Sequence, residues 1–182
     1  MLSRTDKIPD EIFFTAIFDS PFGDLSAVVS AQGVFALHFG RRAFPHLNCV
    51  ESAEKTAECR KQLAEYFAGK RLRFTLPLDL RGTPFQKQCW QALLEIPYGE
   101  TRSYAEIARS IGRPRACRAV GLANHDNPVV IVVPCHRVIG ANGSLTGYGG
   151  GLDVKRGLLE FECRHGNTVP LFSQLRRAAE AE

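Results

Sequence analysis

The residues that could do chemistry gather at the end of one apolar run. Residues 129–139 read VVIVVPCHRVI, so that a cysteine, a histidine and an arginine follow five β-branched residues and a proline. A thiol is a strong nucleophile only as a thiolate, and a neighbouring imidazole or guanidinium lowers its pKa. Cys135 is therefore a candidate nucleophile, with His136 as a candidate base. A buried structural cysteine is the alternative interpretation, and it describes most free cysteines.

Backbone geometry limits how His136 can act on the thiol. The run VVIVV is typical of a buried strand or extended segment, and Pro134 limits its continuation. Adjacent residues of an extended strand point to opposite faces, so His136 could not touch the Cys135 sulfur there. Either the backbone turns at this point, or the imidazole acts through an intermediary such as water.

A group of arginines precedes this stretch. The net charge of the 182 residues is +4, and the segment 102–118 carries arginines against the single acid Glu106. A small basic face of this kind suits phosphates, and a solvated helix surface is the alternative. The arginines of the segment are Arg102, Arg109, Arg113, Arg115 and Arg118.

The elements around these residues are predicted to be short helices. The sequence TPFQ at 83–86 is typical of a capping box with proline at the first helical position, and predicts a helix over 84–95. A second box, SYAE, opens a helix that runs to about residue 110, and small side chains mark a third helix over about 115–124. Two short helices joined by a glycine-containing turn are typical of a DNA-binding helix-turn-helix, although many all-helical proteins contain such corners.

The first part of the chain has a different pattern. The runs IFFTAIF, DLSAVV and VFALHF, separated by SPFG and SAQG, predict a three-stranded antiparallel meander. A helical pattern follows over 51–68, and RFTLPLDLRG then predicts an extended link. The expected fold class is therefore α+β.

Composition excludes several classes of protein. Apolar residues make up 45% of the chain, but no stretch approaches 18 consecutive apolar residues, and the N-terminal MLSRTDKIPDE is charged where a signal peptide is apolar. We therefore expect a cytosolic or nuclear protein. The six cysteines lack CxxC pairing, which favours reduced thiols, and His38, His46 and Cys49 form no four-ligand set. No metal and no cofactor are predicted.

Several segments together resemble the O6-alkylguanine-DNA alkyltransferases, DNA repair proteins that remove alkyl groups from guanine. PCHRV preceded by NP, RGTPFQKQCWQALLEIPYGETRSYAEIA, GRPRACRAVGLANHDNPV and GYGGGLDVKRGLLEFE resemble that family's C-terminal domain in order and spacing. The resemblance covers about residues 81–163. It implies a ribonuclease H-like N-terminal domain, a small antiparallel sheet with a helix, over 1–80. It also implies an all-α domain with a helix-turn-helix over 81–165, which binds DNA and accepts the alkyl group, and a tail over 166–182.

The resemblance also implies a reaction. Cys135 would take the alkyl group from O6 of guanine and be consumed, because a thioether offers no leaving group that water or a thiol readily displaces. His136 would act as its base through a bridging water, and Glu162 would orient the imidazole. Asn127 would tie the two halves of the site together. Tyr104 would donate a proton to the leaving guanine at O6 or N3.

By the same resemblance, the protein works on double-stranded DNA as a monomer, with no membrane. Arg118 matches the family's arginine finger, which fills the gap left in the duplex when the damaged nucleotide is flipped out. The recognition helix would sit in the minor groove, where sequence is read poorly. The further implied DNA contacts are Arg115, Ala116, Ala119, Arg137 and Ser103. The implied pocket residues are Val138, Tyr148, Gly149, Gly150 and Lys155.

Three rival functions use the same residues. A lesion sensor without chemistry would lack cysteine at position 135, which is present here. A regulatory protein that signals through a methylated cysteine would need a further zinc-bearing domain, and a thiol hydrolase would need an acyl substrate. The sequence leaves open the preference between methyl and larger groups, activity on O4-alkylthymine, cooperativity on DNA and the role of the tail.

Overall fold

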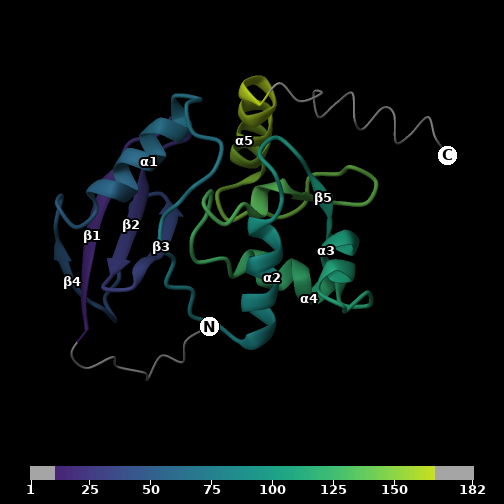
Figure 1. The fold of residues 1–182 in the computed structure, drawn as a ribbon, viewed down its shortest axis with the longest axis horizontal. Coiled ribbons are helices and arrows are strands. Elements are labelled where there is room, and N and C mark those ends of the chain that lie inside the picture. Colours follow the sequence, from purple (N-terminus) through teal and green to yellow (C-terminus); the bar gives the residue numbers. More distant parts are fainter. Residues whose placement is uncertain (1–10, 167–182) are drawn as a thin grey trace. The chain divides into compact units, whose positions relative to one another are not determined.

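The computed structural model describes residues 11–166, which form two compact units (Figure 1). The first contains the described residues up to Gly82 together with Pro128–Val130, and the second contains Thr83–Asn127 and the described residues from Ile131 onward. The expected tail falls almost wholly outside the described residues. Within residues 11–166, every helix is too short or too polar to cross a membrane.

The first unit is built on a four-stranded sheet with the order β3-β2-β1-β4. Its first three strands form the antiparallel meander that the sequence predicts. The fourth strand was not predicted; it pairs in parallel with β1, and all four of its residues are exposed, so it has no alternation of apolar residues. The strands are β1 (Ile12–Phe18), β2 (Leu25–Ser30), β3 (Gly33–Phe39) and β4 (Asn48–Glu51).

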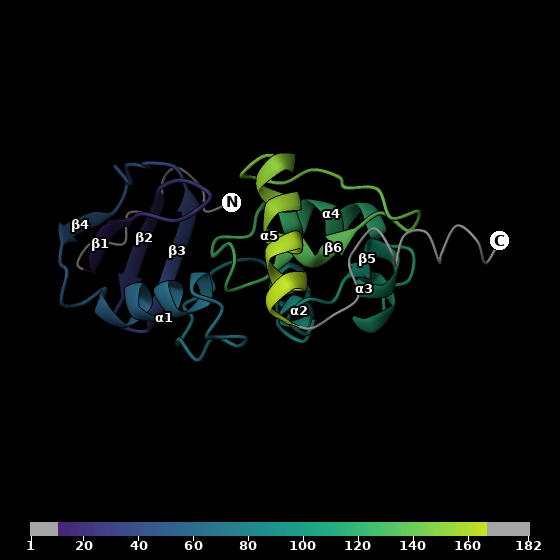
Figure 2. The ribbon, with the colours of Figure 1, turned by 90° about the horizontal axis from the view of Figure 1, so that it is seen from above.

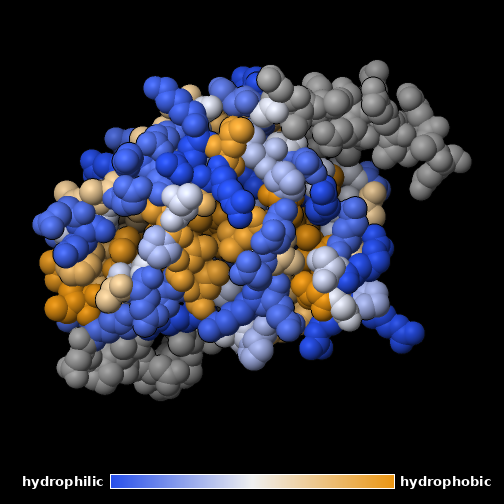
Figure 3. All heavy atoms as spheres, in the orientation of Figure 1, coloured by the Kyte–Doolittle hydropathy of each residue, from blue (hydrophilic) through white to orange (hydrophobic). Residues whose placement is uncertain are grey.

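The helix α1 (Ala57–Phe67) covers one face of this sheet (Figure 2) and buries Leu63 and Tyr66. The helix was predicted over 51–68 but begins only at Ala57, because residues 48–51 form β4. The turn before α1 is closed by a bond from the Thr56 hydroxyl to the Ser52 carbonyl, 2.7 Å. Some apolar side chains of β1 and β4 stay exposed, and hydrophobic surface is visible over these strands in Figure 3. They are Ile12, Ile17 and Val50.

The outer edge of β3 is paired by two later segments. Val34 donates its N–H to Pro77 O at 2.8 Å, and its carbonyl accepts a bond from Asp79 N–H at 3.0 Å. Leu37 exchanges the equivalent bonds with Pro128 O and Val130 N–H, at 2.8 and 3.0 Å. Residues 128–130 lie inside the range expected for the second domain, but they belong to the first unit because their backbone groups satisfy this edge.

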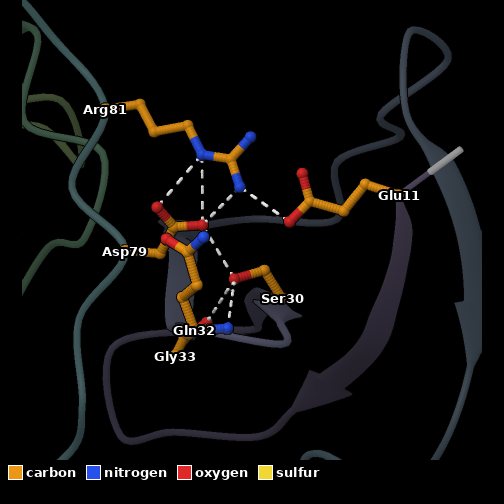
Figure 4. Close-up of polar contacts among 6 residues, drawn as sticks. All are labelled: Glu11, Ser30, Gln32, Gly33, Asp79 and Arg81. Carbon is orange, nitrogen blue, oxygen red and sulfur yellow. Dashed lines mark hydrogen bonds and ion pairs between the residues drawn. The ribbon is translucent and has the colours of Figure 1, made fainter. Parts of the chain in front are cut away.

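A polar network fixes the predicted extended link to the first unit (Figure 4). The nearly buried carboxylate of Asp79 accepts a bond from the Ser30 hydroxyl at 2.7 Å and several from the Arg81 guanidinium, the shortest 2.6 Å. Arg81 also donates to Glu11 at 2.7 Å, and it stacks over the rings of Phe13 and Phe35. This link is therefore an ordered part of the first unit.

The second unit consists mainly of helices, as predicted. Capping boxes start α2 and α3. The side chains of Thr83 and Ser103 accept a bond from the backbone N–H three residues on, and the side chains of Gln86 and Glu106 accept a bond from the N–H of Thr83 and Ser103. Trp90 donates from its indole nitrogen to Ala123 O, 2.8 Å, and so ties α2 to α4. The helices are α2 (Pro84–Leu94), α3 (Tyr104–Ser110), α4 (Cys117–His125) and α5 (Leu152–His165), and β5 (Arg102–Ser103) pairs in parallel with β6 (Val138–Ile139).

We expect Asp79→Asn to lower the free energy of unfolding by about 2 kcal/mol, because charge-assisted hydrogen bonds contribute roughly 1.5–3 kcal/mol. Urea denaturation measures this change. The control is Asp24→Asn, which removes a pair with Arg41, whose side chain is 71% exposed, and should lower stability by less than about 1 kcal/mol. Equal losses in the two variants would mean that the Asp79 network contributes no more than a surface pair.

Candidate alkyl-acceptor site

The chain changes direction twice before Cys135. Ile131 has φ 71°, a left-handed conformation that is rare for a β-branched residue. After Pro134 the backbone enters a short 3-10 helix, η1 (Cys135–Arg137), instead of continuing as a strand. The backbone therefore turns here, and residues 130–132, which were expected to be a strand or an extended segment, lie in a turn. Cys135 and His136 both lie buried in this turn, at 5% and 0% exposure.

Asn127 holds both the Cys135 sulfur and the chain before it. Its side-chain nitrogen donates to Sγ at 3.0 Å and to the carbonyl of Val133 at 2.7 Å. Burial raises the pKa of the Cys135 thiol, while the Asn127 bond, the charge of Lys155 and nearby backbone amides act in the opposite direction. In the structure, Asn127 thus joins the turn before η1 to the candidate nucleophile.

The other cysteines provide a contrast. All six are free thiols. Cys59, in α1, is buried too, and burial raises the pKa of its thiol to about 12, because no donor or cation opposes it. Cys135 differs from Cys59 in having groups around it that stabilise a thiolate.

His136 and Glu162 form a buried pair. The Nε2 atom of His136 lies 2.9 Å from Oε1 of Glu162, and both side chains are fully buried. Because a carboxylate can only accept, Nε2 carries the proton, and the neutral ring keeps its lone pair on Nδ1. Nδ1 is buried and has no hydrogen-bond partner among residues 11–166. The lone pair is therefore available to accept a proton.

Arg137 occupies the opposite side of the same carboxylate. Its Nε and one terminal nitrogen donate to the two oxygens of Glu162, both at 2.9 Å, and its other terminal nitrogen donates to Ile96 O at 2.6 Å. The prediction that Arg137 contacts DNA is wrong, because its side chain is only 7% exposed and its donors are directed inward. It is an internal counter-ion of the site.

The charges of this cluster follow from its contacts. Burial alone would raise the pKa of Glu162, but His136 and Arg137, by charge and hydrogen bonding, hold it well below its ordinary value. Burial lowers the pKa of His136, and the opposing effect of Glu162 does not reverse this. At neutral pH the cluster therefore consists of a carboxylate, a guanidinium and a neutral imidazole.

The expected pocket residues surround a loop at 146–151. Lys155 donates from Nζ to the carbonyls of Val138 and Thr146, at 2.6 and 2.9 Å, and burial lowers its pKa to about 8. The Thr146 hydroxyl donates to the hydroxyl of Tyr104 at 3.1 Å. Burial, and then the charges of Cys135 and Glu162, raise the pKa of the Tyr148 phenol. The structure leaves Gly149 exposed and Gly150 partly exposed at this loop.

The helix-turn-helix formed by α3 and α4 carries the expected DNA-contacting residues. Arg118 and Arg115 are exposed and form no ion pair with another described residue, and Ala116 and Ala119 are partly exposed beside them. Figure 3 shows hydrophilic side chains projecting around these helices, at the lower right. The Ser103 hydroxyl is already engaged, because it caps α3 and donates to Glu106.

Two features of the site were missed by sequence reasoning. The inward direction of Arg137 is one, since nothing in the string PCHRV distinguishes it from a surface arginine. The other is Asn124, in the last turn of α4, whose side chain is buried although it reads as an ordinary helix-end polar residue. In neither case does the local pattern carry the signal, because both depend on contacts with distant segments. Between residues 11 and 166, no group of three or more metal-ligating side chains is present.

We expect Glu162→Gln to lower the free energy of unfolding by about 3–5 kcal/mol, since it leaves the buried Arg137 charge without its partner. Because the folded pKa of Glu162 lies below its ordinary value, its ionisation stabilises the wild type above about pH 4.5, and this stabilisation is lost as the pH falls through the folded value.

Urea denaturation at several pH values measures both effects. The acid loss of stability should be smaller in Glu162→Gln than in the wild type. Glu160→Gln, two residues away on the same helix and partly exposed, serves as the control and should behave as the wild type. A wild-type acid profile in Glu162→Gln would contradict the assignment of an ionised buried carboxylate.

Comparison with known proteins agrees with this geometry. Residues 84–164 match the family described as 6-O-methylguanine DNA methyltransferase, DNA binding domain, and residues 13–80 match its ribonuclease-like domain. A methylated-DNA--protein-cysteine methyltransferase of Methanosarcina acetivorans is 51% identical over 152 residues, which cover 82% of this chain and 97% of that protein. One of Mycolicibacterium paratuberculosis is 62% identical over 116 residues, 64% of this chain and 70% of the relative.

Solved structures give the same result for the fold. The crystal structure of Mycobacterium tuberculosis OGT in complex with DNA matches with a TM-score of 0.78 and 49% identity, over 85% of this chain and 94% of that one. The M. tuberculosis O6-methylguanine methyltransferase structure matches with a TM-score of 0.76 and 48% identity, over 86% and 94%. Matches to both halves of the chain, in sequence and in structure, establish that this protein belongs to the O6-alkylguanine-DNA alkyltransferase family.

Proposed function

We propose that this protein is a methylated-DNA-[protein]-cysteine S-methyltransferase, which repairs DNA by moving an alkyl group from O6 of guanine to Cys135. The observation that carries the proposal is the surrounding of the sulfur: an amide donor from Asn127 at 3.0 Å, and beside it the buried His136–Glu162 pair. A neutral imidazole held by a carboxylate is a suitable base for a thiol. The DNA-binding-domain match over 84–164 covers all of these residues.

In the proposed reaction, the thiol proton passes to Nδ1 of His136 through a bridging water. The thiolate then attacks the alkyl carbon, the new C–S bond forms as the C–O6 bond breaks, and the electron pair leaves with the guanine. Tyr104 donates its hydroxyl proton to the departing base. The imidazolium of His136 then gives its proton to the Tyr104 oxygen, so that the phenol is restored. The net change moves the thiol proton to guanine and the alkyl group to sulfur, so atoms and charge balance.

The proposed reaction occurs once per molecule. The product is a thioether, and its sulfur gives water or another thiol no readily displaced leaving group. No cofactor is required, because the sulfur itself is the acceptor. The protein is therefore a stoichiometric transferase that is consumed by its substrate.

Base flipping is the proposed means of access. A thiol buried in a protein cannot reach O6 inside a stacked base pair, and extruding a nucleotide costs a few kcal/mol. The exposed Arg118 on α4 is suited to fill the space left in the duplex, and the small Ala116 and Ala119 allow α4 to approach the minor groove. We assign the pocket of the flipped base to the loop at 146–151 and Tyr104, and propose O4-alkylthymine as a weaker substrate.

We further propose that the protein acts as a monomer. It would act in the cytoplasm, or in the nucleus of a eukaryote.

The first test is intact mass after incubation with a duplex carrying one O6-methylguanine. We expect the protein to gain the mass of one methylene, on the Cys135 peptide, and to stop at one per molecule. Cys135→Ser should gain nothing, whereas Cys117→Ser, which removes a partly exposed thiol at the start of α4, should react as the wild type. Tight binding without any gain in mass would leave a lesion sensor, and continued turnover would contradict the single use.

Arg118→Ala tests the role of the finger. We expect it to slow reaction with the methylated duplex at least tenfold, since a loss of about 1.4 kcal/mol of flipping free energy gives a factor of ten. Reaction with free O6-methylguanine base should be nearly unchanged, because a free base needs no extrusion. Arg109→Ala, on α3, removes the same charge as a control. Equal losses on duplex and free base in Arg118→Ala would overturn the finger assignment.

A further inference from the structure

The side-chain amide of Asn124 is buried without a hydrogen-bond partner. The residue is 9% exposed, and neither its Oδ1 nor its Nδ2 atom bonds to any other described residue. Leaving a buried polar group unsatisfied costs roughly 1–3 kcal/mol, and the large majority of buried polar side chains have partners. A buried amide without a partner among residues 11–166 is therefore a candidate to hydrogen-bond a ligand.

Its position places the amide between two residues of the proposed reaction. Gly121 and Asn124 lie three residues apart in α4, and just after the helix the N–H of Asn127 donates to Asn124 O at 3.3 Å. Residues three apart on a helix are neighbours on one face. At one end of this row, a Cβ added to Gly121 would lie 3.9 Å from the ring of Tyr104. At the other end, Asn127 bonds the Cys135 sulfur.

We propose that the Asn124 amide hydrogen-bonds the flipped O6-alkylguanine and selects it over O4-alkylthymine. The inference rests on the proposed function, since it takes the space between Tyr104 and Cys135 as the base pocket. It makes Asn124 a specificity-determining residue of that reaction, beyond the residues that the resemblance assigns.

The chemistry of the base fits the amide. A carboxamide presents one acceptor and one donor side by side. In O6-alkylguanine the 2-amino group is a donor, and the ring nitrogens beside it, N1 and N3, are acceptors because alkylation at O6 removes the N1 proton. Two parallel hydrogen bonds can therefore form. In O4-alkylthymine the corresponding edge carries only acceptors, N3 and O2, so the Asn124 oxygen would stay unpaired against them.

The test compares Asn124→Leu with the wild type on two duplexes, one with O6-methylguanine and one with O6-methylhypoxanthine, which lacks the 2-amino group. We expect the wild type to methylate Cys135 at least tenfold faster with the guanine lesion. In Asn124→Leu this preference should fall to within about twofold, chiefly through a slower reaction with O6-methylguanine. The control is His125→Leu, at the next and exposed position, which should keep the wild-type ratio.

A second measurement separates this role from a structural one. Because the amide has no partner among residues 11–166, an apolar side chain of similar size should raise the urea midpoint of the DNA-free protein, or leave it unchanged. A large fall in that midpoint, or failure to fold, would show that the amide is bonded within the chain, and would overturn the inference.

The outcomes distinguish this inference from the function on which it rests. Wild-type protein that gains no methyl group from either duplex would refute the proposed function. Wild-type protein that reacts, but without preference for the guanine lesion, would overturn only the inference. The same holds if the preference persists unchanged in Asn124→Leu.

Discussion

Four hydrogen bonds converge on the buried carboxylate of Glu162: one from His136, two from Arg137 and one from the backbone N–H of Gly99. They join η1, α5 and the turn before β5, three segments that lie far apart in the sequence. The carboxylate of Glu162 and the guanidinium of Arg137 cancel in charge, so the imidazole that also bonds the carboxylate has no need to be protonated. A buried charge without a counter-charge would be costly. The site can therefore be buried only because Glu162 and Arg137 are paired.

The same burial creates the difficulty that the site must overcome. A thiol away from water holds its proton more tightly, and at rest Cys135 is a poor nucleophile. A protonated and shielded thiol also resists oxidation and stray alkylation, which suits the single use proposed above. The Asn127 donor and the charge of Lys155 favour the thiolate, and in the proposed reaction the His136 lone pair would accept the proton.

Sequence reasoning succeeded where local chemistry decides the structure and failed where distant contacts do. The capping boxes at Thr83 and Ser103 placed α2 and α3 correctly, because the bonds that start a helix lie within four residues. Strand β4 escaped notice because its residues are exposed and because it pairs with β1, from which β2 and β3 separate it in the sequence. Family resemblance supplied the roles of the site residues, but the same resemblance led to the wrong assignment of Arg137, whose direction depends on its bonds to Glu162 of α5.

Helix α4 has an exposed face and a buried face. In the proposed reaction, this arrangement would link binding of DNA to recognition of the damaged base. Arg118 and Leu122, one turn apart, are exposed, and Leu122 is 66% exposed despite being apolar. An exposed apolar side chain beside an arginine is suited to a groove wall, where bases and sugars are less polar than phosphates. Asn124 is buried on the other side of the helix, and Asn127, just after the helix, bonds the sulfur. Since a nine-residue helix moves as a rigid unit, docking of its exposed face on DNA would, in the proposed reaction, fix the distance between its buried face and a flipped base.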